Sequence, residues 1–353
     1  MIGCCRSNLT HFERGERPFP ERRIKQVLAA LNGAEDGLSI PMMQQHVNLA
    51  KGQIEKTIKF LSVETPAPVV KQGSRWYTTP IEYEMDREAI ERLCALRRDE
   101  QREMQDYMQT SECLMQFLAR ALDDPSAGPC SRCSNCAGEP LLLETIDADL
   151  ANEAAMFLRR SHQSIKPRKL WPKNAFPEYG FSGRISPDLM AEEGRALSLW
   201  GDAGWGQLVH DGKYTDRKFS DDLVEGCAEM IETWKPEPKP QWVTCVPSLK
   251  SPDLVPNFAA RLAARLGVPF VDCVKKIGDN QPQKEMQNSF LQGKNLDGVF
   301  EIEDDLIPDG PAFLIDDMVD SRWTFTVIAA LLKDSGCPAV FPVALAMTSP
   351  RSG

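Results

Sequence analysis

The chain has 353 residues, of which 42% are hydrophobic and 26% are charged. This is ordinary globular composition at a length typical of two or three domains, and it excludes wholesale disorder and collagen-like repeats. No apolar run approaches the ~18 residues of a membrane helix, and the N-terminus lacks the apolar stretch of a signal peptide. Eleven cysteines without such a signal favour free thiols or bound metal over disulfides. We therefore expect a cytoplasmic protein that does not bind membranes.

The net charge of −10 is distributed unevenly along the chain. Basic residues outnumber acidic ones within 1–80 and 151–180, and acidic residues dominate elsewhere. A chain with a net negative charge is not typical of proteins that coat nucleic acids. The two basic islands either contact phosphate locally or form ordinary solvated surface.

Residues 1–19 carry no periodicity and are predicted to form a loose arm. Apolar residues spaced three and four apart predict helices at about 20–32, 39–47 and 50–63. The segment VVKQGSRWYTT then alternates around a glycine, which is typical of a β-hairpin. Three helices and a hairpin within 20–85 predict a winged helix-turn-helix domain.

Residues 86–140 are predicted to form a metal-binding helical hairpin. The stretch 86–122 is helical in pattern, with a break near Thr110, and it leads into a loop rich in small residues. Cys130, Cys133 and Cys136 place three thiolates in that loop, and Cys113 of the preceding helix can supply the fourth. Four thiolates with no open position make a closed, structural Zn²⁺ site. An iron–sulfur cluster uses the same ligands, and incidental buried thiols are the remaining alternative.

Residues 141–185 are predicted to form a helix at 148–160 followed by the basic, proline-punctuated segment SHQSIKPRKLWPK, which is a linker or a strand-like crossing segment. Trp171 in this linker either stacks on a base or docks the linker onto its neighbour. From 186 to 353, short apolar strands alternate with helices, which indicates a parallel α/β sheet. Strands are expected at 242–248, 268–274, 312–317 and 339–346, and helices at 252–266 and about 322–335. The predicted fold class is therefore multidomain, α+β followed by α/β.

The spacing C-x16-C-x2-C-x2-C behind a helical hairpin resembles the zinc-binding module of RecQ-type DNA helicases. The resemblance implies Cys113, Cys130, Cys133 and Cys136 as the zinc ligands. A motor is missing, because no G-x-x-x-x-G-K-[ST] occurs: the Gly-Lys pairs at 212–213 and 293–294 are followed by Tyr and Asn. This chain therefore cannot hydrolyse ATP by P-loop chemistry.

The segment AFLIDDMVDSRWTFTVIAALL resembles the phosphoribosyl pyrophosphate (PRPP) signature of type I phosphoribosyltransferases. The resemblance extends over about 195–347, where it is closest to the competence-protein branch of that superfamily. It implies that Asp316 and Asp317 bind ribose hydroxyls and that the loop Asp320–Thr324 cradles the 5′-phosphate. The implied site residues are Asp316, Asp317, Asp320, Ser321, Arg322 and Thr324.

The same loop departs from the family pattern. Arg322 stands where a glycine is usual, Asp320 brings a negative charge, and the indole of Trp323 is expected to fill the phosphate space. We therefore expect a vestigial site that binds a nucleotide or PRPP weakly, without transferase turnover and with no catalytic residue.

The order of these domains resembles the C-terminal half of the RqlH branch of RecQ-like bacterial helicases. It implies a DNA-binding accessory module of an ATP-dependent 3′–5′ DNA helicase, acting in DNA repair on single-stranded or tailed duplex DNA, with the motor upstream in cis. An active phosphoribosyltransferase, and a zinc-containing winged-helix regulator with a nucleotide-sensing domain, are the alternatives. The predicted DNA contacts are Lys51, Lys56, Lys59, Lys71, Arg75, Arg168 and Lys169.

Overall fold

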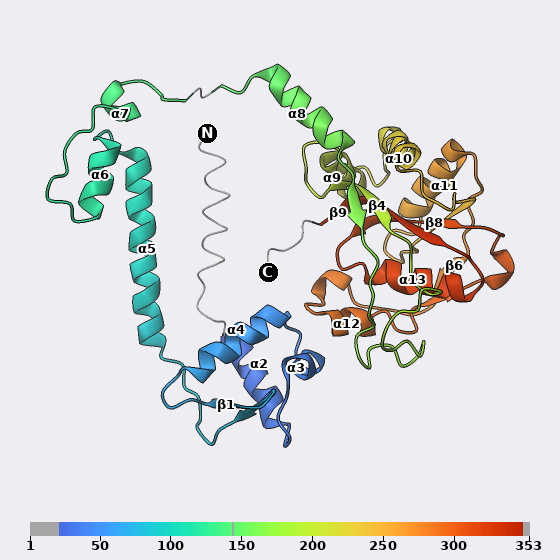
Figure 1. Ribbon diagram of the computed structural model, residues 1–353, viewed down its shortest axis with the longest axis horizontal. Coiled ribbons are helices and arrows are strands. Elements are labelled where there is room, and N and C mark those ends of the chain that lie inside the picture. The colour runs from blue at the N-terminus through green and yellow to red at the C-terminus, as the bar shows by residue number, and fades with distance from the viewer. Residues whose placement is uncertain (1–20, 143–144, 349–353) are drawn as a thin grey trace. The chain divides into compact units, whose positions relative to one another are not determined.

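The computed structural model describes residues 21–142 and 145–348 (Figure 1). The chain divides into two units, the first comprising Met1–Met43 and Gln53–Ala148 and the second Gln44–Gly52 and Asp149–Gly353. The predicted arm at residues 1–19 lies outside the described residues. In the part of the chain that the structure describes, no helix combines the length and apolar character needed to cross a membrane.

The first unit begins with three helices and a hairpin. These are α2 (Glu21–Asn32), α3 (Ile40–His46), α4 (Lys51–Ser62), β1 (Val69–Gln72) and β2 (Arg75–Thr78). Ile24, Val27 and Leu31 of α2 are buried at the predicted helical spacing. Leu38 joins the hairpin through two backbone hydrogen bonds with Trp76, of 3.0 and 2.9 Å. The predicted order of elements is present, and its use as a winged helix on DNA stays a prediction.

The segment Gln44–Gly52, which joins α3 to α4, is counted with the second unit. There the buried side-chain amide of Asn288 donates hydrogen bonds to the carbonyl oxygens of Gln44, Val47 and Leu49, at 3.2, 3.1 and 3.1 Å. The two N–H groups of one side-chain amide are thereby shared among three carbonyl groups at and just beyond the end of α3.

The rest of the first unit holds α5 (Arg87–Gln109), α6 (Leu114–Ala121) and α7 (Ser134–Ala137). The predicted break near Thr110 is confirmed, since α5 ends there and Thr110 has an extended ψ of 143°. Asp86 caps the start of α5 by accepting a hydrogen bond from the backbone N–H of Ala89, at 2.8 Å. Cys113 and Cys133 occupy the cap positions that precede α6 and α7.

The second unit is built on a five-stranded sheet of order β3-β4-β9-β8-β5, in which β3 is antiparallel and the other four strands are parallel. Its strands are β3 (Gln163–Ile165), β4 (Gly194–Leu199), β5 (Trp242–Cys245), β8 (Ala312–Val319) and β9 (Val340–Met347). Its helices are α8 (Ala148–Arg160), α9 (Gly206–Tyr214), α10 (Asp221–Trp234), α11 (Leu254–Leu266), α12 (Ser289–Lys294) and α13 (Trp323–Asp334). A separate hairpin pairs β6 (Val274–Lys276) with β7 (Phe300–Ile302), and two short 3-10 helices span Gln283–Glu285 and Asp304–Leu306.

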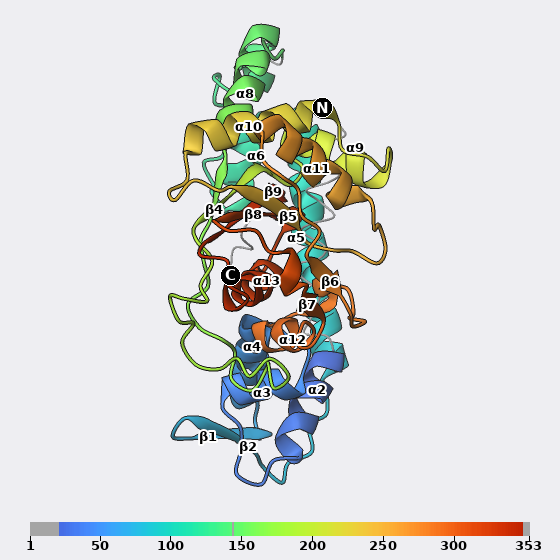
Figure 2. The same ribbon diagram turned by 90° about the vertical axis from the view of Figure 1, so that its right-hand side faces the viewer.

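Successive residues of the strands face two different cores. Phe313 and Ile315 of β8 pack in one cluster with α9, α10 and α11, whereas Ala312 and Leu314 pack in the other with α13. Figure 2 shows α10 and α11 on one side of the sheet and α13 on the other. Alternation of this kind is the two-residue period of a strand buried on both faces.

One expectation for this unit is changed by the structure. The apolar run 268–274 does not form a strand of the sheet: Phe270 makes an isolated bridge with Val243, and the regular pairing begins only at Val274. Two ladder bonds form there: the N–H of Val243 donates to the carbonyl oxygen of Pro269 at 2.9 Å, and the N–H of Val271 donates to that of Val243 at 2.8 Å. The basic segment contains a strand, one of the two forms expected for it, because Gln163–Ile165 forms β3 at the edge of the sheet.

Candidate functional sites

The four predicted cysteines converge on one point in the first unit. The Sγ atoms of Cys113, Cys130, Cys133 and Cys136 all lie within 4.8 Å of one another, and those of Cys113 and Cys133 are 3.9 Å apart. Four sulfurs bound to one tetrahedral ion at about 2.3 Å would be separated by about 3.8 Å. The cluster therefore has the size of a four-thiolate metal site.

Backbone N–H groups around the cluster point at the sulfurs. Cys130 and Gln116 donate to Cys113 Sγ at 3.2 and 3.5 Å, and Leu114 donates to Cys133 Sγ at 3.4 Å. Arg132 and Cys133 donate to Cys130 Sγ at 3.4 and 3.3 Å. Donors of this kind stabilise thiolates more than thiols, and thiolates are the form that binds metal.

The pKa values of the thiols follow these contacts. Hydrogen bonds from the N–H groups of Cys130 and Gln116 lower the pKa of Cys113. Burial opposes ionisation of Cys133, but the N–H groups of Cys136 and Leu114 outweigh it and bring its pKa to about 6. The neighbouring sulfurs of Cys133 and Cys113 raise the pKa of Cys136 to about 11. One shared positive ion would remove this conflict between adjacent thiolates, so the donor set fits a metal.

In the second unit, the sheet topology marks a ligand crevice. The connection after β5 runs through α11 on one face, whereas the connection after the neighbouring strand β8 runs through α13 on the other face. Adjacent parallel strands whose connections leave on opposite faces open a crevice at their carboxyl ends, where α/β proteins bind ligands. The pairing of β5 with β8 ends at Cys245 and Ile315. The next residues of β8, Asp316 and Asp317, therefore lie at this point.

The two carboxyl groups have different environments. Asp317 forms an ion pair with Lys213 of α9, with Nζ and Oδ2 2.8 Å apart. Asp316 accepts a hydrogen bond from the backbone N–H of Asp317, at 2.8 Å. Burial and the adjacent charge of Asp317 raise the pKa of Asp316 well above its usual value of 3.8. The pair thus offers one carboxyl whose ionisation is opposed by burial and by its neighbour's charge, beside a carboxylate that is paired with a lysine.

The loop after β8 keeps a glycine-like backbone without a glycine. Arg322 precedes α13 with φ 67° in the left-handed region, the conformation that favours glycine. No side chain caps the first N–H groups of α13. Asp320 is exposed, and its carboxylate accepts a hydrogen bond of 2.7 Å from the hydroxyl of Thr348. Ser321 and Thr324 are half-buried.

The expectation that the indole of Trp323 fills the phosphate space is wrong. Trp323 is 1% exposed and belongs to the core on the α13 face of the sheet. Its ring packs against Trp171 and Phe176, with centroids 6.1 and 5.9 Å away. The first turn of a helix that covers a sheet turns one side chain inward, and here that side chain is the indole.

The basic segment before β4 reaches this loop. Arg168 Nε donates to the carbonyl oxygen of Ser321 at 2.8 Å, and Arg322 Nη1 donates to the carbonyl oxygen of Lys166 at 3.0 Å. The guanidinium carbon of Arg168 lies 3.8 Å from the centroid of the Trp323 ring. Trp171 is 6% exposed and stacks on Phe181, which agrees with docking of the linker and not with base stacking.

The predicted DNA contacts are distributed over both units. Lys51, Lys56 and Lys59 are exposed on α4, and Lys71 is exposed on the hairpin. Arg75 is half-buried and donates to the carbonyl oxygen of Asp36 at 2.9 Å. Lys169 is exposed, whereas Arg168 is half-buried in the contacts just described. Contact with DNA by any of them stays a prediction.

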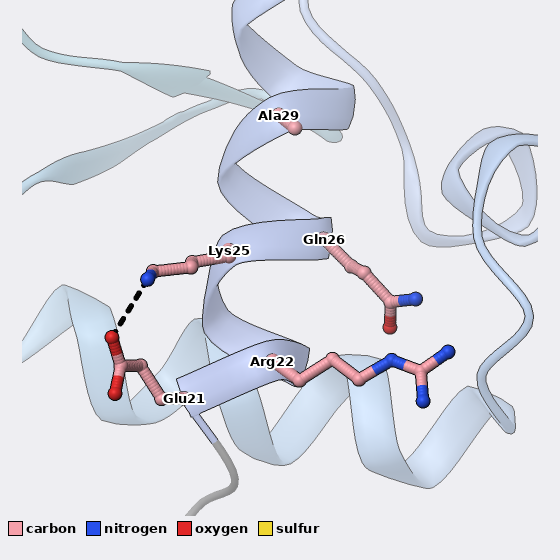
Figure 3. Close-up of a pocket in the computed structure, with 5 residues that line it drawn as sticks. All are labelled: Glu21, Arg22, Lys25, Gln26 and Ala29. Atoms are coloured by element: carbon pink, nitrogen blue, oxygen red, sulfur yellow. Dashed lines mark ion pairs between the residues drawn. The ribbon is translucent and has the colours of Figure 1, made fainter.

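Two surface hollows hold none of these site residues. One, of about 490 Å³, is lined by α2 residues, which are Glu21, Arg22, Lys25, Gln26 and Ala29. Figure 3 shows Lys25 turned toward Glu21, with which it pairs at 2.7 Å, while Arg22 and Gln26 project from another side of the helix. The other, of about 540 Å³, includes Lys235, Arg265 and Phe313 at the amino end of β8. Neither brings together groups that would perform chemistry.

Sequence reasoning missed Lys213 and the role of Arg168 at the loop. Lys213 lies about a hundred positions from Asp317, and no spacing rule links them. Arg168 was visible only as one member of a basic run. The positive φ of Arg322 was signalled indirectly, by the glycine expected at that place in the loop.

Replacing Asp316 by Asn should change how the stability of the second unit depends on pH. The raised pKa of Asp316 means that the folded state holds a proton which the unfolded chain has released. This stabilisation is complete below about pH 4 and is lost as the pH rises through the folded-state pKa. The Tm of Asp316→Asn minus that of wild type should therefore increase as the pH rises from about 4 through the raised folded-state pKa of Asp316.

Thermal melts followed by tryptophan fluorescence test this, because six of the seven tryptophans lie in the second unit. Asp309→Asn, at an exposed position just before β8, is the matched control. Parallel Tm curves for Asp316→Asn and Asp309→Asn would contradict the assignment.

Comparisons with known proteins give resemblances among solved structures. No family model matches the sequence, and no curated protein matches it. An adenine phosphoribosyltransferase is similar at 16% identity and a TM-score of 0.28, over 55% of this chain and 89% of that one. The adenine phosphoribosyltransferase of Saccharomyces cerevisiae shows 15% identity, a TM-score of 0.28, and coverage of 56% and 89%. A purine phosphoribosyltransferase of Pyrococcus horikoshii Ot3 shows 21% identity, a TM-score of 0.23, and coverage of 36% and 71%. At such TM-scores the likeness carries no argument about function.

Proposed function

We propose that the second unit is a phosphoribosyltransferase-type domain that binds a 5-phosphorylated ribose at the carboxyl ends of β5 and β8. One observation carries this proposal: an acid pair, a short loop and the uncapped start of α13 follow each other at the point where the connections of two adjacent strands leave on opposite faces. Ribose hydroxyls need hydrogen-bonding acceptors, and a phosphate needs N–H donors and positive charge. The site offers both along eight residues of chain.

The acid pair would hold the sugar. The carboxyl oxygens of Asp316 and Asp317 can both accept hydrogen bonds from ribose hydroxyls, and Asp317 can keep its contact with Lys213. The loop Asp320–Thr324 would hold the phosphate through the N–H groups at the start of α13. Since Trp323 packs inward, its indole leaves that space open.

Transfer of the ribosyl group is a further step, and we expect it to be slow. A developing positive charge at the anomeric carbon is stabilised by nearby carboxylates. Here burial and the charge of Asp317 oppose ionisation of Asp316, and Asp317 is already paired with a lysine. Binding without rapid turnover is the function that these environments favour.

Calorimetric titration of the full chain with PRPP and Mg²⁺ tests the binding. Wild type should bind, and Asp316→Asn/Asp317→Asn should weaken binding roughly tenfold or more, because hydrogen bonds to charged groups are worth about 1.5–3 kcal/mol each. Asp309→Asn should bind as wild type does. Absence of binding in wild type, or equal affinity in the double variant, would contradict the proposal.

For the first unit, we propose that the four cysteines bind one structural Zn²⁺. Four thiolates that enclose a tetrahedral volume leave no open coordination position for catalysis. The loop from 123 to 133 has little apolar content of its own, so the metal would supply its folding free energy.

Elemental analysis of the purified chain should give about one zinc per chain. Cys133→Ser should lose the metal and melt at a lower temperature, whereas Cys94→Ser on α5, outside the cluster, should retain it. Iron in place of zinc, or full zinc occupancy in Cys133→Ser, would refute the assignment.

A second candidate function is contact with DNA, favoured by the three exposed lysines of α4. An accessory role in a RecQ-type helicase rests on the sequence resemblance alone. Lysines on one helix that contact phosphates would give weak, salt-dependent binding with little sequence preference.

Fluorescence anisotropy with a tailed duplex tests this second candidate. Lys56→Glu/Lys59→Glu should weaken binding and lower the slope of log K against log salt by about two, since each phosphate contact contributes about 0.9. Lys235→Glu/Lys239→Glu, an equal charge reversal at exposed positions of the second unit, is the control. Identical slopes for the two double variants would count against binding through α4.

A further inference from the structure

Two guanidinium groups converge on the loop between β8 and α13, and only one of them belongs to that loop. We propose that Arg168, from the segment before β4, binds the terminal phosphate of the ligand together with Arg322, so that the site selects sugars that carry a doubly charged phosphomonoester. This inference rests on the proposed function and adds a specificity-determining residue to it.

The placement of Arg168 is fixed by contacts at two of its faces. Its Nε donates to the carbonyl oxygen of Ser321 at 2.8 Å, and its plane lies on the buried ring of Trp323 at 3.8 Å. Arg322 contacts the same segment, because its Nη1 donates a hydrogen bond of 3.0 Å to the carbonyl oxygen of Lys166. Each of these bonds uses one N–H of a guanidinium that has five. The remaining N–H groups are held in place beside the loop.

These two positive charges have no carboxylate partner among residues 21–142 and 145–348. Asp320, the nearest acid in sequence, accepts a hydrogen bond from Thr348. Burial and the neighbouring charge of Arg322 lower the pKa of Arg168 to about 10. Two like charges brought together in a partly buried place repel each other, and an anion bound between them would convert this repulsion into attraction.

The start of α13 adds donors at the same place. The helix has 12 residues, follows Arg322 directly, and leaves its first N–H groups without a side-chain cap. The helix dipole and these N–H groups favour a negative charge within the first turn. Three sources of positive potential, two on side chains and one on the backbone, therefore meet at a single loop.

The chemistry of this arrangement favours a phosphomonoester. A guanidinium fork binds two oxygens of one phosphate, and two forks match the three terminal oxygens and two charges of a monoester dianion. A phosphodiester carries a single charge and a second substituent on phosphorus, so it offers the two forks fewer oxygens and half the charge. The free sugar offers neither.

Titration of the full chain with ribose 5-phosphate and with ribose tests the inference. Wild type should bind the phosphate ester and not ribose. Its affinity should rise between about pH 5 and about pH 7, as the ester takes its second charge near pH 6. Arg168→Gln should lose roughly tenfold to a hundredfold in affinity and most of this pH dependence. Lys173→Gln removes the same charge from an exposed position of the same segment and should behave as wild type.

The outcomes separate the two proposals. Equal affinity in Arg168→Gln and Lys173→Gln, with wild type binding ribose 5-phosphate, would overturn the role of Arg168 and leave the proposed function intact. Failure of wild type to bind either ribose 5-phosphate or PRPP would overturn the proposed function itself. If Arg168→Gln does not fold, two other measurements test the inference. An affinity of wild type for ribose 5-phosphate that is the same at both ends of the pH range would overturn it. Arg168→Lys, which keeps the charge but lacks the guanidinium fork, should bind ribose 5-phosphate more weakly than wild type, and equal affinity would also overturn it.

Discussion

Burial of the Trp323 indole is the contact on which the candidate site of the second unit depends. The ring is 1% exposed at the first turn of α13, so it fixes where that helix begins and therefore where the preceding loop must turn. Two of its neighbours, Trp171 and Arg168, come from a segment about 150 residues earlier in the chain. One aromatic side chain thus positions the loop and also the basic segment that crosses it. Large aromatic rings suit this role because they bury much area with little loss of side-chain freedom.

Both candidate sites use backbone N–H groups to stabilise negative charge. In the cysteine cluster, backbone N–H groups of short turns point at sulfur atoms, and ionisation of Cys133 is thereby favoured. At the start of α13, no side-chain cap takes up the first N–H groups, which lie next to the loop. Backbone donors are held by the fold itself, so they require no side-chain ordering when a metal or an anion arrives. Side chains then set which metal or which anion fits.

Local pattern was sufficient for much of this protein. Three-and-four spacing predicted α2 and α4, and the cysteine spacing predicted a cluster because three ligands lie within one loop. The acid pair was visible as two polar residues that end an apolar strand. The ion pair of Lys213 with Asp317 and the stacking of Arg168 on Trp323 depend on how distant segments pack, and no local pattern carries that information. The expected direction of the Trp323 side chain was wrong for the same reason. A helix that covers a sheet buries the residues that face the sheet, and this packing does not depend on which residue the family usually has at that position.

The edge strand β3 also determines where this chain can be divided. Gln163, Ser164 and Ile165 pair with β4, and Trp171 covers the ring of Trp323 from the same segment. A fragment that began at residue 186, where the strand-and-helix alternation starts in the sequence, would leave β4 as a bare edge with unpaired N–H and carbonyl groups. It would also uncover an indole. Open edges of this kind recruit other strands, so such a fragment would tend to aggregate, and a soluble one has to begin before Gln163.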